Sequence, residues 1–326
     1  DAPKVTFDVE PIVKTTITKS NGDKVTIETE TDLKEGTSVT LKLPVYGVGN
    51  ATHARVEHDG KPMGSYRIQE GNYVEVTVSG FSPYSTQAIN NDNVVAKVGD
   101  QVFTDLQEAI KAAAPDGTVD ILKDVTVDKW IMITESLTIG NDQLITIPSI
   151  NGLTINGNNH TLTVKSIESA SNGNNLFYDA TNLNVLNLTI NCVGAAANQG
   201  GIGLTSGTIR NVTFNGGAGV FPGTGEVTIT GCTFNTSGTA IYFETERDKL
   251  TVTGNTFNVT DKDGYAIILR GATTFTDNEV NSGKVNLADN ATGTVSGNDF
   301  GDVRFKVYNG ATATIHDNKI NNLVFN

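Results

Sequence analysis

The sequence predicts an all-β protein whose larger, C-terminal part is a stacked solenoid, and three observations support this prediction. A five-residue phrase recurs seven times, residues 1–90 alternate apolar and polar positions in short runs, and only one segment has convincing helical periodicity. Threonine and asparagine are abundant, which favours strands and turns over helices. We therefore expect strands joined by turns along almost the whole chain.

The repeated phrase closes at regular intervals over the last 140 residues. Its seven copies are residues 187–191, 211–215, 231–235, 254–258, 277–281, 297–301 and 317–321, and their last residues lie 24, 20, 23, 23, 20 and 20 positions apart. A period near 20, with Gly, Asn or Asp at a turn position and one apolar residue at a core position, is typical of a solenoid. No single repeat of this kind buries its own apolar face, so the repeats must stack.

Each position of the phrase has a predicted structural role. The opening residue is Asn, Gly or Asp in all seven copies, which predicts a left-handed backbone there. The closing asparagines are expected to stack and to hydrogen-bond one another along the solenoid. They are Asn191, Asn215, Asn235, Asn258, Asn281 and Asn321, and a second, shorter stack is expected from Asn255, Asn278, Asn298 and Asn318. These amides are interpreted as structural and not as site residues.

The remaining pattern divides the chain into two predicted domains. Residues 1–90 contain period-two strands separated by turn pairs such as Asn21-Gly22 and Asp59-Gly60, which predicts a small β-sandwich. Residues 91–326 form the solenoid, which begins with an amphipathic helix over residues 104–114. Thr104 and Gln107 fit a capping box at the start of this helix. We expect the helix to cover the exposed edge of the first coil.

Charge and cysteine content limit the classes of partner. The chain has 23 Lys and Arg against 36 Asp and Glu, a net charge of −13, which repels nucleic-acid phosphates. It contains no apolar run of 18 residues, so we expect no membrane insertion. Cys192 and Cys232 occupy different positions of the repeat and are expected to be free, buried thiols. The start of the chain at Asp-Ala-Pro is consistent with a secreted protein after signal removal, which predicts an extracellular location.

Residues 94–326 resemble the right-handed parallel β-helix family of pectate-lyase-like folds. The resemblance rests on the helix at 104–114, on the segment 153–162 and on the repeated Gly/Asp-Asn-x-Phe-Asn phrase. It implies a right-handed parallel β-helix with coils of about 20–24 residues. The family includes polysaccharide lyases, glycosidases, phage tailspikes and surface adhesins, so the fold alone leaves the function open. The order of the two domains also resembles the modular surface proteins of gut bacteria.

The candidate ligand surface consists of outward-facing residues on the longer strands between the phrases. Alternation predicts that Ile241, Phe243, Ile267, Leu269, Val285, Leu287, Phe305 and Val307 point inward. The outward set is then Tyr242, Glu244, Ile268, Arg270, Asn286, Lys306 and Tyr308. Aromatic rings beside Arg, Lys, Asn and Glu suit a sugar surface. The alternative interpretation is that Glu244 and Arg270 form a surface ion pair between neighbouring coils.

Catalytic and metal-binding interpretations have weaker support. Glu244 is the only carboxylate in the outward set, whereas glycosidases need a pair. Arg270 and Lys306 offer a base for a polysaccharide lyase but lack a cluster of aspartates beside them. We predict no cofactor. The alternative is a calcium ion held by Glu246, Asp261 and Asp263.

A second outward surface has a Thr-apolar-Thr pattern. It comprises residues 228–230, 251–253, 274–276, 294–296 and 314–316, with Ser296 and His316 in place of the last two threonines. Such an array resembles the ice-contacting faces of β-solenoid antifreeze proteins, although threonine is also an ordinary solvent-facing strand residue. The chain stops on a strand at Asn326 without a polar cap, which predicts further coils or a partner at this end.

These observations favour a non-enzymatic, extracellular, adhesin-like module of a bacterial surface protein that binds glycans or host surfaces through the β-helix. A polysaccharide lyase or glycoside hydrolase is the first alternative, and ice binding is the second.

Overall fold

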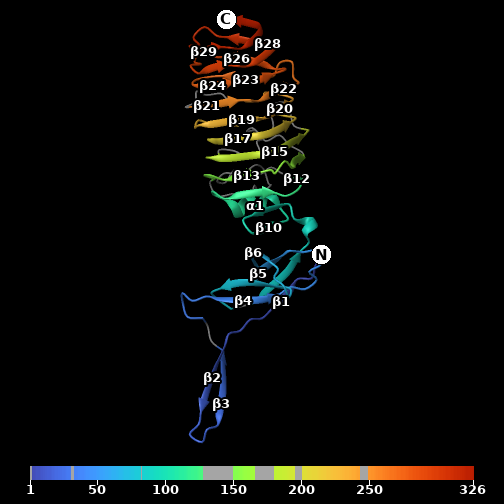
Figure 1. Cartoon of the computed structure of the whole chain (residues 1–326), viewed down its shortest axis with the longest axis vertical. Helices are drawn as coiled ribbons and strands as arrows, with labels where there is room; N and C mark the ends of the chain where they lie inside the picture. Colours follow the sequence, from blue (N-terminus) through green and yellow to red (C-terminus); the bar gives the residue numbers. More distant parts are fainter. Residues whose placement is uncertain are drawn as a thin grey trace, which may run out of the picture. The chain divides into compact units, whose positions relative to one another are not determined.

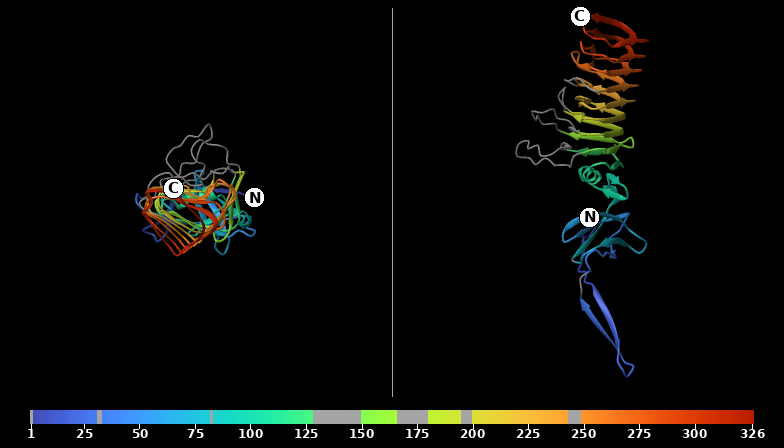
Figure 2. Two further views of the ribbon diagram at one scale, coloured as in Figure 1. Left: turned by 90° about the horizontal axis from the view of Figure 1, so that it is seen from above. Right: turned by 90° about the vertical axis from the view of Figure 1, so that its left-hand side faces the viewer.

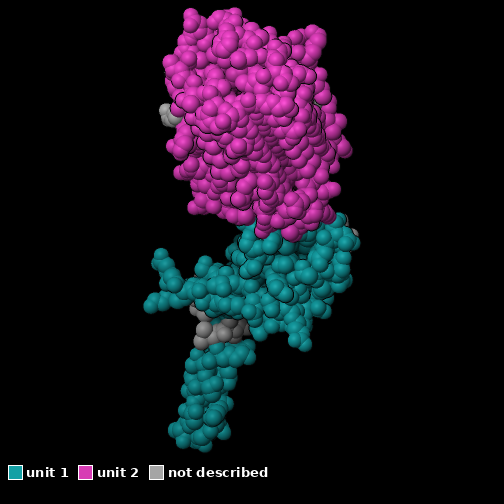
Figure 3. All heavy atoms as spheres, turned by 45° about the horizontal axis from the view of Figure 1, so that its top comes forward, with its two compact units in different colours: residues 1–104 teal, residues 105–326 magenta. Residues whose placement is uncertain are grey.

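The computed structural model describes residues 2–30, 33–81, 83–127, 150–165, 180–194, 200–242 and 249–326. The chain divides into two compact units, residues 1–104 and residues 105–326 (Figure 3). Both units are built almost entirely from β-strands (Figure 1).

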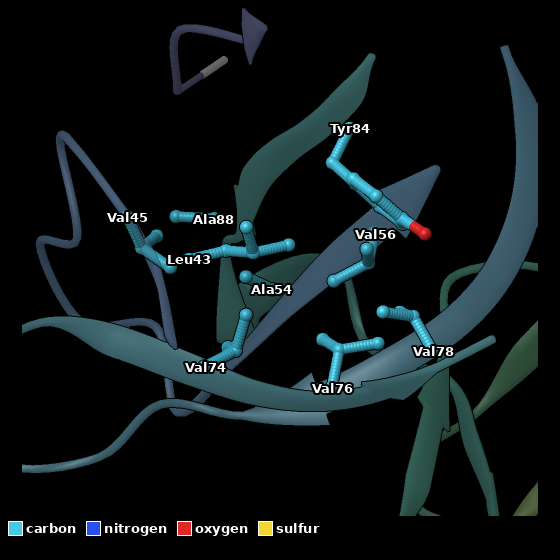
Figure 4. Close-up of a cluster of buried hydrophobic side chains, with 9 residues drawn as sticks. All are labelled: Leu43, Val45, Ala54, Val56, Val74, Val76, Val78, Tyr84 and Ala88. Carbon is cyan, nitrogen blue, oxygen red and sulfur yellow. The ribbon is translucent and has the colours of Figure 1, made fainter. Parts of the chain in front are cut away.

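The first unit contains antiparallel strands that share one core. A four-stranded sheet has the order β1 (Val5–Phe7), β8 (Tyr84–Ile89), β5 (His53–His58) and β6 (Lys61–Arg67), while β4 (Val39–Pro44) pairs with β7 (Tyr73–Val78). Asp59 and Gly60 have φ values of 51° and 70° and join β5 to β6, as the turn pair predicted. The core contains Leu43, Val45, Ala54, Val56, Val74, Val76, Val78, Tyr84 and Ala88 (Figure 4).

Five further short elements complete the first unit. Strands β2 (Ile12–Thr18) and β3 (Lys24–Glu30) form a separate two-stranded hairpin. A 3₁₀ helix, η1 (Asn91–Asn93), precedes the antiparallel pair β9 (Ala96–Val98) and β10 (Gln101–Phe103).

The second unit begins with helix α1 (Leu106–Ala113). Leu106, Ala109, Ile110 and Ala113 are buried, which is the apolar stripe that the sequence predicted. The predicted capping box at Thr104 and Gln107 is wrong by one residue. Asp105 is the N-cap, has an extended backbone and accepts a hydrogen bond from the Glu108 amide at 3.0 Å. The sequence contains two overlapping capping patterns, and the more strongly accepting carboxylate occupies the cap.

After α1, parallel strands are arranged in three columns. The first column contains β11 (Thr118–Ile121), β13 (Thr154–Asn156), the start of β15 (Leu183–Val193), the start of β17 (Gly207–Asn215), β19 (Val227–Thr230), β21 (Leu250–Thr253), β24 (Thr273–Thr276), β27 (Thr294–Ser296) and β29 (Thr314–His316). The second contains β12 (Val125–Val127), β14 (Thr161–Lys165), the ends of β15 and β17, β20 (Thr233–Thr236), β22 (Thr256–Val259), β25 (Glu279–Val280) and the starts of β28 (Asp299–Val307) and β30 (Lys319–Phe325).

The third column contains β16 (Ile202–Leu204), β18 (Val220–Pro222), β23 (Tyr265–Leu269), β26 (Lys284–Leu287) and the ends of β28 and β30. Ile241 bridges β18 to β23 through parallel pairs with Val220 and Ile267. Successive strands of the second unit lie one above another (Figure 2). The result is a long, mainly parallel sheet system in which the repeated phrase recurs at each level.

Phenylalanines of the phrase stack inside the second unit. Phe214, Phe234 and Phe257 are in register, and their ring centroids are 5.0 Å and 4.9 Å apart with nearly parallel planes. All three are almost completely buried. The apolar position of the phrase therefore forms a continuous core, which accounts for its recurrence in the sequence.

The predicted left-handed backbone is confirmed at all seven opening positions. Their φ values lie between 51° and 69°, at Asn187, Asn211, Gly231, Gly254, Asp277, Gly297 and Asp317. The first asparagine stack is confirmed from Asn191 to Asn281, where each amide donates to the one before it over 2.7–3.0 Å. Its predicted continuation to Asn321 is wrong, because Gly301 carries no side-chain amide at the intervening level. Asn321 donates to Asp302 instead, over 2.9 Å.

Candidate functional site

The candidate site is the outward face of β23, β26 and the end of β28, which we call the third-column face. Ile268, Asn286 and Lys306 form one row in register across the three strands. Neighbouring strands in a sheet are about 4.8 Å apart, so these side chains emerge side by side. The face is defined by Ile268, Arg270, Asn286, Arg304, Lys306 and Tyr308.

Buried neighbours hold this face in place. The residues predicted to point inward are buried at Ile241, Ile267, Leu269, Val285, Leu287 and Phe305, and Val307 is half-buried. The predicted inward positions are therefore buried or half-buried within the described residues, which exclude Phe243, but burial does not alternate strictly because Ala266 and Asn286 are buried as well. Because one face of each strand is fixed in the core, the register of the outward side chains is fixed as well.

Three cations lie on the third-column face. Arg270, Arg304 and Lys306 are half-buried, and within the described residues none of them forms an ion pair. The Nε atoms of Arg270 and Arg304 are buried and have no hydrogen-bond acceptor in the described part of the chain. Guanidinium N–H groups are strong donors, so the Nε–H of each arginine is a donor that makes no hydrogen bond to the described residues. This part of the chain is locally cationic although the protein carries a net charge of −13.

Arg304 was not included in the predicted set. The predicted inward and outward sets start at Phe305 in this strand, whereas β28 begins at Asp299 and is nine residues long. Register shifts between Asp299 and Arg304 interrupt simple alternation, which concealed the earlier part of the strand. The informative signal is the Arg-Phe-Lys sequence, because a buried phenylalanine between two cations places both of them outward.

Asn286 differs from the expectation of an exposed outward residue. Only 5% of its surface is exposed, and its Oδ1 atom is buried without a hydrogen-bond donor. A buried amide oxygen without a partner costs about 1–3 kcal/mol. Asn286 therefore adds an unused acceptor between Ile268 and Lys306.

Two tyrosines contribute aromatic surface. The Lys306 Nζ lies 4.3 Å from the centroid of the Tyr308 ring, which is a cation–π contact. The predicted site residue Tyr242 is half-buried and packs edge-on against Phe221, with ring centroids 6.0 Å apart. One side of the Tyr308 ring, directly after β28, is thus covered by a cation from that strand.

The predicted acidic residues fall into two groups. Glu244 and Glu246 lie outside the described residues. Asp263 accepts from Lys262 at 2.6 Å and from Lys284 at 2.9 Å, and Asp261 accepts from the Asp263 amide at 3.0 Å. These lysines, Lys262 first, hold the pKa of Asp263 at about 2, below its usual value of 3.8. Within the described residues, no group of three or more His, Cys, Asp and Glu side chains is arranged to hold a metal ion. The calcium site stays a prediction.

Threonine rows run along the first column. Thr208, Thr228, Thr251, Thr274, Thr294 and Thr314 are in register, and Thr230, Thr253, Thr276 and Ser296 form a parallel row. The Thr276 hydroxyl donates to that of Thr253 over 3.0 Å. A similar row, Thr161, Thr189, Thr213, Thr233 and Thr256, follows the second column. The threonine pattern is therefore common to two columns.

Comparisons of the chain with protein-family models, with curated proteins and with solved structures found no match. Within the described residues, no helix has the length and apolar character required to span a membrane.

The third-column face combines three kinds of chemical group. Its three cationic side chains are hydrogen-bond donors, the Asn286 amide is an acceptor, and Tyr308 contributes an aromatic ring. Such a set binds ligands rich in oxygen. The described part of the face contains no pair of carboxylates that would serve as the acid and base of glycoside hydrolysis.

Proposed function

We propose that the chain is a non-enzymatic, extracellular, adhesin-like surface module that binds glycans or host surfaces through the third-column face. Its second unit is proposed to be a right-handed parallel β-helix of about 20–24-residue coils, in which α1 covers the first coil. The three columns of parallel strands support this proposal, as does the recurrence of the phrase at each level.

The observation that carries the proposal is the pair of buried arginine Nε atoms without acceptors. Arg270 and Arg304 lie on one face with Lys306, and the Nε atoms of both arginines have no hydrogen-bond partner among the residues that the structure describes. A buried polar group without a partner costs roughly 1–3 kcal/mol. Arg270 and Arg304 are only half-buried, so a ligand that supplies an acceptor recovers this energy when the guanidinium groups turn toward it. Sugar hydroxyls and carboxylates are such acceptors, and Tyr308 adds a ring of the kind that packs on sugars.

The proposal is tested by screening the chain on a glycan array with and without calcium, together with an activity scan on polymeric uronic acids. We expect binding to a defined set of glycans, no depolymerisation, and loss of binding in Arg270→Ala. Depolymerisation that requires calcium and disappears in Arg270→Ala would instead establish the lyase alternative. Absence of binding to any glycan would refute the glycan proposal.

Ice binding is the second candidate, and the threonine rows of the first column favour it. The two rows repeat at the strand spacing of about 4.8 Å, which creates a regular array of half-exposed hydroxyls. Measurements of thermal hysteresis and ice-crystal shape test this candidate. Unshaped crystals and zero hysteresis would exclude it.

A further inference from the structure

The hairpin of β2 and β3 stands apart from the sheets of the first unit. Its seven residue pairs run from Ile12 opposite Glu30 to Thr18 opposite Lys24, and it pairs with no other strand within the described residues. Both outer edges of the hairpin therefore retain backbone groups able to pair with another strand. A lone two-stranded hairpin is marginally stable in water, so a further strand would stabilise it.

The hairpin has one apolar and one polar face. Ile17 lies opposite Val25, and Thr15 lies opposite Ile27. Ile17, Val25 and Ile27 are exposed by 49%, 37% and 46%, which is unusual for three β-branched residues on one face. Nothing described in the structure covers this face.

The opposite face is polar and internally paired. Lys14 and Glu28 form an ion pair at 2.6 Å, and the hydroxyls of Thr16 and Thr26 are 3.3 Å apart. Residues 12–30 contain three lysines and three acidic residues, so the hairpin has no net charge within a chain of −13. Two copies of the protein can therefore approach through the hairpin without the repulsion expected for the rest of the chain.

We propose that β3 pairs antiparallel with β3 of a second copy, about a two-fold axis at Thr26. In this register Val25 lies opposite Ile27 of the second copy, and Lys24 lies opposite Glu28 of the second copy. Each pair occurs twice because the interface is isologous. The apolar pairs extend the exposed face of Val25 and Ile27, while the charged pairs lie on the polar face.

The edge of β3 is favoured over that of β2 because, about the matching axis, only β3 is complementary to itself. The equivalent pairing of two β2 strands about Thr16 places Lys14 opposite Thr18 and Thr15 opposite Ile17. It therefore creates neither an ion pair nor an apolar pair. The self-complementary charges of β3 thus identify a second copy of this chain as the partner, independently of any glycan.

Charge exchange on the full chain tests the proposal. Lys24→Glu places two acidic residues opposite each other, and Glu28→Lys places two lysines opposite each other. We expect the wild-type chain to double its molar mass with rising concentration in sedimentation equilibrium. Each single variant should remain monomeric, whereas an equal mixture of the two variants should form heterodimers, because every facing pair then has opposite charges.

Two further variants separate the interface from the folding of the hairpin. Lys24→Glu combined with Glu28→Lys should restore the homodimer, since the charges are exchanged and not removed. Lys14→Gln removes the ion pair inside the hairpin and should leave the dimer intact. A wild-type chain that stays monomeric, or a mixture of the single variants that does not associate, would overturn the proposal.

Discussion

Asn255 and Asn278 are joined by two hydrogen bonds to a single oxygen. The backbone N–H and the side-chain Nδ2 of Asn255 donate to the Asn278 Oδ1 at 2.9 Å and 3.0 Å. Asn278 makes the same pair of bonds to Asn298, and its Nδ2 also donates to the carbonyl of Val252 at 3.0 Å. Each amide therefore satisfies the backbone of neighbouring levels inside the protein, where water does not reach.

Replacing Asn278 with leucine should destabilise the second unit by about 3 kcal/mol. The substitution leaves the Asn255 amide and the Val252 carbonyl buried without partners, and each such group costs roughly 1–3 kcal/mol. Urea denaturation followed by circular dichroism measures the change. Asn321→Ala is the control, since Asn321 is exposed and its side chain makes one hydrogen bond within the described residues, to Asp302. This variant should shift stability by less than about 0.5 kcal/mol.

Gly254 should tolerate asparagine better than alanine. Its φ is 65°, and a Cβ at this position meets no atom within 4 Å, so backbone conformation alone determines the cost. We expect Gly254→Ala to destabilise by about 1 kcal/mol and Gly254→Asn by less. Gly297 has a similar backbone conformation but less space, because a Cβ added there would clash with the Asp277 carboxylate. Equal melting temperatures for both Gly254 variants would contradict this explanation.

The carboxyl group of Asp263 should titrate well below the usual aspartate pKa of 3.8. Its lowered pKa means that its ionised form favours the folded state above about pH 4, and that this contribution is lost as the pH falls toward 2. Lys284→Gln should raise the pKa toward 3.8, with Lys262 retaining part of the shift. Carboxyl NMR titration of both proteins measures it, and an unchanged pKa in the variant would show that Lys284 has no part in the shift.

Cys232 should resist thiol reagents until the second unit unfolds. Cys232 is 1% exposed, and burial raises the pKa of its thiol to about 11. Because the thiolate is the reactive form, folded protein at pH 8 should react far more slowly than unfolded protein. Cys192 is also buried, with its pKa raised by burial, and both cysteines are free as predicted. Rapid labelling of Cys232 in the folded protein at pH 8 would contradict this prediction, because it would show that reagents reach the core around Cys232.

Much of the fold could be predicted because the repeated phrase encodes local backbone geometry. Asn187 and Gly254 differ in size, yet both occupy the left-handed position that the spacing indicated. The prediction was wrong where local rules gave two solutions. Thr104 and Asp105 both fit a helix cap, and only the three-dimensional structure shows which side chain reaches the free amide.

The candidate site was less predictable because it depends on contacts between levels. Alternation placed Asn286 outward, but it does not reveal that neighbouring side chains bury the amide. Arg304 was missed because the register shifts in β28 interrupt the period-two pattern. Residue spacing therefore predicts which face a side chain occupies more readily than whether its polar atoms find partners.

Titration calorimetry of the full chain with the tightest glycan from the array tests the role of the third-column face most directly. Two variants are compared, Arg304→Gln on this face and Thr251→Ala on the first column. We predict that Arg304→Gln weakens binding at least tenfold, or about 1.4 kcal/mol, while Thr251→Ala leaves the affinity unchanged. Full affinity in Arg304→Gln together with loss of binding in Thr251→Ala would contradict the proposal and place the ligand on the threonine rows.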